Sequence, residues 1–136
     1  MILIDTDVIM DVFFSRTGFE NDSKMIFEIC EKERSGVVTP VICANLNYFL
    51  TKEFGKKRSI EILKSLLTFL SVIDQNEKSV ISALESDFTD FEDALQHFAA
   101  TENGKVQAII TRNTKDYKHS EIPVFTPTEF IAQLDV

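Results

Sequence analysis

Residues 1–7, MILIDTD, place three apolar side chains directly before two carboxylates, Asp5 and Asp7. A short, unbroken apolar run of this kind is typical of a strand covered on both faces. If Ile2 to Ile4 form such a strand, Asp5 lies at its carboxyl end, where oxygen ligands for a hard cation are needed. We interpret Asp7 as the N-cap of the helix that follows.

Four further segments are brief, apolar and mostly β-branched, and we predict that they are strands. They are Gly36 to Thr39, Ser71 to Ile73, Val106 to Ile110 and Pro123 to Phe125. Helix signals occupy the intervals, and this alternation predicts a parallel sheet with helices on both faces. In such folds ligands bind beyond the carboxyl ends of the strands.

Several helix boundaries are predicted by capping patterns. Thr39-Pro40 predicts an N-cap followed by proline at the first position, opening a helix through about Phe54. Thr89 to Glu92 and Thr126 to Glu129 both match the capping box, and Asn103-Gly104 predicts a helix end. One helical stripe is predicted to be buried: Ile60, Leu63, Leu66, Leu67 and Leu70.

Length and charge limit the possible functions. The 136 residues, numbered 1–136, suit a single domain with a real core and are too few for a TIM barrel. A net charge of −8 disfavours a protein that neutralises nucleic acid with Lys and Arg alone. Carboxylates gathered in one cleft can still act on phosphates through divalent cations. A nucleic-acid substrate would therefore require a metal.

The cysteines and the hydropathy pattern predict a cytoplasmic protein. Cys30 and Cys43 are too few for a disulfide framework, and we interpret them as small hydrophobes in a reducing compartment. The longest uncharged run, residues 35–51, contains Gly36 and Pro40, which argues against a membrane span.

A second acidic cluster lies in residues 90–95, DFEDAL. Asp90 and Asp93 are three positions apart, so they lie on one face of the predicted helix and repel each other unless a cation lies between them. The alternative is an acidic first turn stabilised by the helix dipole. Glu92 is accounted for by its capping box, and we interpret His97 as a packed histidine.

A third cluster, residues 111–116, TRNTKD, follows the predicted strand Val106 to Ile110. It again places an Asp and an amide at the carboxyl end of a strand, although a polar loop with Asx turns would look similar. Each cluster alone is a weak signal. The three together predict a cation site.

With these motifs the chain resembles the PIN-domain family, whose bacterial members include many ribonuclease toxins of the VapC type. The resemblance runs the whole chain and rests on Ile4 to Asp7, on Asp93 to Leu95 followed by Ala99-Ala100, and on Thr111 to Asn113 with Asp116 before an aromatic residue. It implies a three-layer α/β/α sandwich. Its central, mostly parallel sheet would have four to five strands, with the first and fourth side by side.

The resemblance also implies the chemistry, which is hydrolysis of RNA phosphodiesters with Mg²⁺ or Mn²⁺. Asp5, Asp93 and Asp116 would be the catalytic, metal-holding carboxylates. Supporting roles would fall to Asn45, Asp90, Thr111 and Asn113, and phosphate contacts to Arg112 and Lys115. From the residues alone, the basic stretch Lys52 to Arg58 is a candidate RNA track, although a solvated turn would look the same. The expected partners are RNA, a second copy of the chain and a small antitoxin, with no membrane.

One position departs from the family's pattern. The family usually has a carboxylate near the start of the helix after the second strand, where this chain has Asn45 and no acid before Glu53. A carboxamide offers an oxygen but no charge, so the metal should bind less tightly. Two other functions therefore stay open: a PIN fold that binds without cleaving, and an aspartate-nucleophile phosphatase, suggested by Asp5-Thr6-Asp7.

Overall fold

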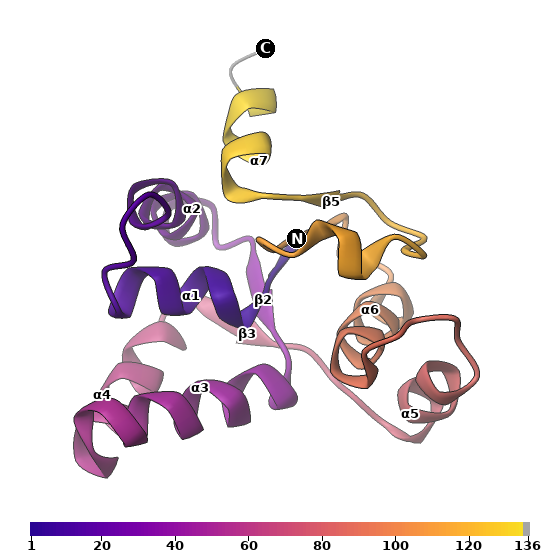
Figure 1. Cartoon of the computed structure of the whole chain (residues 1–136), viewed down its shortest axis with the longest axis horizontal. Helices are drawn as coiled ribbons and strands as arrows, with labels where there is room; N and C mark the ends of the chain where they lie inside the picture. Colours follow the sequence, from indigo (N-terminus) through magenta and orange to yellow (C-terminus); the bar gives the residue numbers. More distant parts are fainter. Residues whose placement is uncertain (135–136) are drawn as a thin grey trace.

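In the computed structural model, which describes residues 1–134, five short strands form one parallel sheet in the order β3-β2-β1-β4-β5 (Figure 1). The strands are β1 (Ile2–Ile4), β2 (Gly36–Val38), β3 (Leu70–Val72), β4 (Ala108–Ile110) and β5 (Val124–Phe125). The predicted pairing of the first and fourth strands is confirmed, with Ile4 opposite Ile110. Since both strands end at the same level, Asp5 and Thr111 leave the sheet together.

Seven α-helices flank the sheet within the described residues. They are α1 (Thr6–Phe13), α2 (Glu20–Glu33), α3 (Pro40–Phe54), α4 (Lys56–Leu66), α5 (Glu77–Leu84), α6 (Phe91–Asn103) and α7 (Pro127–Leu134), with a 3₁₀ turn, η1 (Thr114–Tyr117), after β4. Figure 1 shows α1 and α2 on one side of the strands and α5 and α6 on the other. The predicted α/β/α sandwich is thus confirmed.

Local capping explains where several helices begin and end. The Thr39 hydroxyl accepts a hydrogen bond from the Ile42 N–H at 3.1 Å, so α3 begins and ends as predicted. The capping box between Thr126 and Glu129 forms in both directions. Gly104 ends α6 with a positive φ of 77°, as predicted.

Two local predictions were wrong. Asp90, and not Thr89, caps α6, because its Oδ1 accepts from the Asp93 N–H at 2.9 Å. On α4, Ile60 and Leu67 are 41% and 45% exposed, so the predicted stripe is only partly buried. Leu66 is buried as predicted, Leu70 is buried on β3, and α4 also buries Ile62, which lay outside the predicted stripe.

The core lies between the helices and the three central strands, whose residues are all buried. Gly36 is needed in β2, since a Cβ there would lie 2.7 Å from Cys30 Sγ and 2.5 Å from Leu70 Cδ2. Cys30 is fully buried and Cys43 half-buried, both as free thiols. In residues 1–134 no helix has the length and apolar character that crossing a membrane requires.

Candidate active site

A cavity of about 320 Å³ opens at the carboxyl end of β1, between α1, α3, α6 and the loop after β4. Its polar lining includes Asp5, Asp7, Asn45, Glu92, Asp93 and Asn113. Parallel strands deliver their carboxyl ends to one edge of the sheet, which is why residues so distant in sequence meet here. We call this cavity the acidic cleft.

Asp5 joins the end of β1 to the start of α1. Its side chain caps the helix by accepting from the Thr6 N–H at 2.8 Å, and its Oδ2 accepts from the Thr111 hydroxyl at 2.9 Å. The prediction that Asp7 is the N-cap was therefore wrong, because Asp5 already fills that position. Thr111 connects the ends of the two central strands, a positioning role close to the one expected of it.

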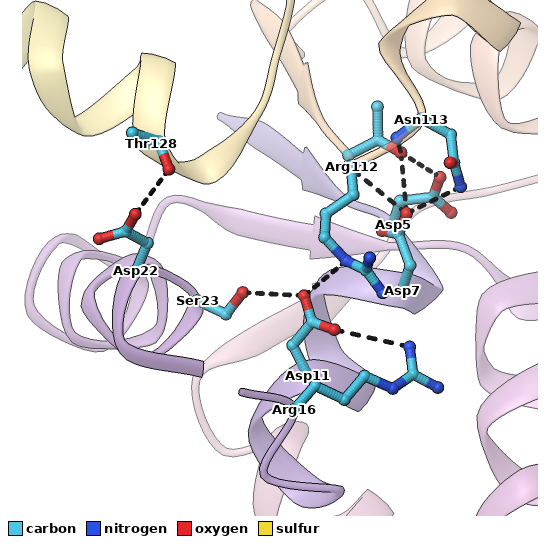
Figure 2. Close-up of polar contacts among 10 residues, drawn as sticks. Asp5, Asp7, Asp11, Arg16, Asp22, Ser23, Arg112, Asn113 and Thr128 are labelled. Carbon is cyan, nitrogen blue, oxygen red and sulfur yellow. Dashed lines mark hydrogen bonds and ion pairs between the residues drawn. The ribbon is translucent and has the colours of Figure 1, made fainter. Parts of the chain in front are cut away.

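Asp7 lies in the first turn of α1 and holds the turn that follows β4 (Figure 2). Its Oδ2 accepts from the Arg112 backbone N–H and from the Asn113 side-chain amide, each at 3.1 Å. Its Oδ1 is buried and has no hydrogen-bond partner among the described residues. A buried, unsatisfied carboxylate oxygen is costly, so this atom marks a place suited to a cation or a donor.

Asp93 reaches Asp5 through a shared hydroxyl. The Tyr117 hydroxyl lies 3.3 Å from Asp5 Oδ2 and 3.3 Å from Asp93 Oδ1. A phenol has one hydrogen, so it can donate to only one of the two carboxylates at a time. Tyr117 is buried, and in the sequence it counted only as an aromatic residue after Asp116. The structure shows that its hydroxyl lies between the two acids.

The pKa values of three cleft acids, Asp5, Asp7 and Asp93, are raised above those of ordinary carboxyls. Burial, followed by the charges of Asp5, Asp90 and Asp116, raises the pKa of Asp93 to about 7. Burial and the charge of Asp5 raise the pKa of Asp7 to about 6. The pKa of Asp5 itself is raised, mainly by burial. The cleft thus gathers buried carboxylates that repel one another.

Two other predicted acids lie at the edge of this group. Asp116, on η1, lies outside the cleft lining, although its charge contributes to the raised pKa of Asp93. Asp90 caps α6 and raises the pKa of both Asp5 and Asp93 by its charge. Lys115 is exposed on the same turn as Asp116.

Asn45 lines the cleft and holds a carboxylate from another helix. Its side-chain amide donates to Glu92 Oε2 at 3.1 Å, joining α3 to α6. Glu92 is free to extend this way because Asp90 makes the cap that the sequence pattern assigned to the Thr89–Glu92 box. The first turn of α6 thus places a carboxylate beside Asn45. No local pattern could reveal a contact between two separate helices.

Arg112 has a structural role. Its Nε forms an ion pair at 2.8 Å with Asp11 Oδ2, and its guanidinium lies 4.1 Å from the centre of the Phe19 ring. Asp11 is fully buried on α1 and also accepts from the Ser23 hydroxyl at 3.4 Å (Figure 2). Asp11 had not been singled out in the sequence, where it appears as one polar residue in an apolar helix. It anchors the side chain expected to bind phosphate.

The carboxylates are near one another without forming a closed cage. Within residues 1–134, no three His, Cys, Asp or Glu side chains are grouped so that they could hold a metal ion as they stand. Asp5 and Asp93 are linked through the Tyr117 hydroxyl, and Asp5 and Asp7 through the Thr111 hydroxyl.

Comparison with known proteins identifies the family. The model of the PIN domain matches residues 1–115, most of the chain. The chain belongs to the PIN-domain family. No curated protein matches this PIN-domain chain.

Solved structures show the same PIN fold at low sequence identity. A toxin–antitoxin complex from Klebsiella pneumoniae is 21% identical with a TM-score of 0.69, covering 93% of this chain and 98% of its own. VapBC2 from Rickettsia felis, bound to a promoter DNA fragment, is 18% identical with a TM-score of 0.67, covering 92% and 97%. Mycobacterium tuberculosis VapC20, a toxin that cleaves the sarcin-ricin loop, is 15% identical with a TM-score of 0.62, covering 80% and 87%.

Proposed function

We propose that this PIN-domain protein is a divalent-metal-dependent ribonuclease and acts in the cytoplasm as the toxin of a toxin–antitoxin pair. The observation that carries the proposal is the pairing of Asp5 and Asp93 about one hydroxyl, in a cleft whose acids have raised pKa values. Perturbed acids gathered in a cleft are typical of catalytic sites. Several structures with the same fold are toxin–antitoxin complexes, which supports a small antitoxin as a partner. A homodimer is proposed with it, as the family resemblance implied.

The residues of the cleft fit a hard cation by donor type. All its acidic and amide groups offer oxygen, the ligand that Mg²⁺ and Mn²⁺ prefer, and Asp7 contributes a buried oxygen without a partner. Magnesium is commonly held by one or two carboxylates and several waters, so the absence of a three-acid group in residues 1–134 is compatible with it. Asp5 and Asp93 would hold the ion, with Asp116 adding charge beside them. The bound ion would polarise a phosphate oxygen and acidify a water molecule.

The remaining residues hold these acids in place. The Thr111 and Tyr117 hydroxyls orient Asp5, and Asp7 fixes the turn that carries Asn113 into the cleft. Asn45 keeps Glu92 at the opposite wall, where its charge would complete the acidic lining. Rigid support of this kind is what positions a scissile phosphate for attack in line with the bond that breaks.

Hydrolysis of single-stranded RNA tests the proposal directly. We expect the wild type to cleave a labelled RNA in Mg²⁺ or Mn²⁺ and not in EDTA, and Asp93→Asn to cleave far more slowly. Millimolar Mn²⁺ should also raise the melting temperature of the wild type and not that of Asp93→Asn, since a ligand of the native state adds stability. A melting temperature that does not respond to Mn²⁺ would argue against the site.

A second function is kept open by Asn45, whose amide faces Glu92 in place of a second acid. Fewer charged ligands would weaken metal binding, and the protein would then bind RNA or a protein without cutting. Tight RNA binding without cleavage at any Mn²⁺ concentration would favour this function. Turnover of p-nitrophenyl phosphate without RNA cleavage would instead favour a phosphatase.

A further inference from the structure

Arg16 stands out in a cleft lined otherwise by acids and neutral groups. Among residues 1–134 it is the only Lys or Arg in the lining, and it lies in the loop between α1 and α2. Its side chain is 37% exposed, and Nη1 lies 3.5 Å from Asp11 Oδ1 (Figure 2). Its guanidinium carbon lies 5.8 Å from the centre of the Phe14 ring. Arg has five N–H donors, so one long contact leaves most of them for a ligand.

Arg16 and Arg112 both contact the buried Asp11, but at different oxygens. Arg112 Nε lies 2.8 Å from Oδ2, which also accepts a hydrogen bond from the Ser23 hydroxyl, whereas Arg16 Nη1 lies 3.5 Å from Oδ1. The Arg112 guanidinium also lies over the Phe19 ring, and Arg112 lines a different cavity. Of the two arginines, Arg16 is the one that lines the acidic cleft.

Phe49 contributes an exposed aromatic ring to the same cavity. It lies on α3, one turn after Asn45, and is 41% exposed. Its neighbour Tyr48 is 62% exposed and lies outside the lining of this cavity. The ring of Phe49 is thus the large apolar surface nearest to the acids on the α3 wall.

We propose that Arg16 and Phe49 are substrate-contacting residues of the acidic cleft: Arg16 binds a backbone phosphate of the RNA, and Phe49 stacks on an unpaired base. This assignment of contacts rests on the proposed nuclease function. A cleft with net negative charge repels a polyanion, so a cation at its mouth gives the backbone a favourable contact. An aromatic face stacks on any free base, and a base already paired and stacked in a duplex cannot reach it. The expected phosphate contact thus moves from Arg112 to Arg16.

Binding to a labelled single-stranded oligoribonucleotide with phosphorothioate linkages tests the inference. The linkages keep the charge, while sulfur is a poor ligand for a hard cation, so cleavage is suppressed during fluorescence anisotropy titrations in Mg²⁺. Arg16→Gln should weaken binding and reduce the slope of log K against log salt by about 0.7, the value for one phosphate contact on a single strand. Phe49→Leu should weaken binding about tenfold and leave the salt slope unchanged.

Matched controls lie outside the lining of the acidic cleft. Lys105→Gln removes an exposed positive charge before β4, and Tyr48→Leu removes the neighbouring aromatic ring on α3. Both should bind like the wild type, and Phe49→Tyr should retain stacking and affinity. Melting temperatures identify any variant that loses RNA binding because it unfolds. If Phe49→Leu unfolds, binding by Phe49→Tyr tests the role of the aromatic ring. If Arg16→Gln unfolds, binding by Arg16→Lys tests the role of the positive charge.

The outcomes separate the inference from the function on which it rests. If Arg16→Gln and Phe49→Leu bind RNA normally, or if the two controls lose as much affinity as they do, the inference is overturned. RNA cleavage by the wild type would still uphold the proposed nuclease function in that case. Duplex RNA bound as tightly as the single strand would also overturn it. A wild type that neither binds nor cleaves RNA would refute the proposed function itself. Binding of an acidic peptide at Arg16 and Phe49 with no RNA bound would show a protein site instead.

Discussion

Replacing Asp7 by Asn should stabilise the metal-free protein at neutral pH. Burial and the neighbouring Asp5 raise the pKa of Asp7 from 3.8 to about 6. One pKa unit corresponds to about 1.4 kcal/mol, so keeping this carboxylate ionised in the folded state costs about 3 kcal/mol. Asn keeps an acceptor for the Arg112 and Asn113 N–H groups, but hydrogen bonds to a neutral acceptor are weaker by about 1 kcal/mol. A net gain of about 1 to 2 kcal/mol is expected at pH 7.5.

The gain should depend on pH in a defined direction. Because the folded protein binds the Asp7 proton more tightly than the unfolded chain, the stability of the wild type falls as the pH rises from about 4 to 6. Below the unfolded pKa of 3.8 the carboxyl is neutral in both states, so the advantage of Asp7→Asn should disappear there. Urea unfolding in EDTA across this range measures both effects, with the exposed Asp87→Asn as control. A variant no more stable than the wild type at pH 7.5, or equally favoured at pH 3.5, would refute the reasoning.

Three further predictions concern single contacts. Tyr117→Phe removes only the hydroxyl between the two cleft acids. It should lower the free energy of unfolding in EDTA at pH 7.5 by about 1 to 2 kcal/mol. An unchanged midpoint of urea unfolding would contradict this prediction. Asn45→Asp places a carboxylate against Glu92, 3.1 Å from the present amide, so it should lower the melting temperature in EDTA and enlarge the rise caused by Mn²⁺. Equal Mn²⁺ shifts in both proteins would mean that Asn45 does not face the ion. Gly36→Ala forces a Cβ against Cys30 Sγ and should lower the free energy of unfolding by about 1 to 3 kcal/mol. Adding Cys30→Ala should restore part of this stability. Urea unfolding measures both changes.

The sequence determined the strands, several helix boundaries and the family, because these depend on neighbouring residues. Thr39-Pro40 specifies the start of α3 through one local hydrogen bond and a fixed φ, whatever the rest of the chain does. The apolar run before Asp5 specifies β1 and puts the acid at its end. Helical spacing was a less reliable guide to burial around α4, where Ile60 and Leu67 remain exposed. Periodicity identifies the apolar face of a helix but not how much of that face the rest of the protein covers.

Only the tertiary structure decided which polar group serves which purpose. Asp5 and Asp7 are equally plausible caps in the sequence, and the choice follows from the turn after β4, which needs the Asp7 carboxylate for two N–H groups. In the same way, Asp11 captures Arg112, leaving Arg16 at the cleft. Such contacts join residues about a hundred positions apart. Their energy depends on burial and on the distance between charges, and neither exists until the central strands bring the two ends of the chain together.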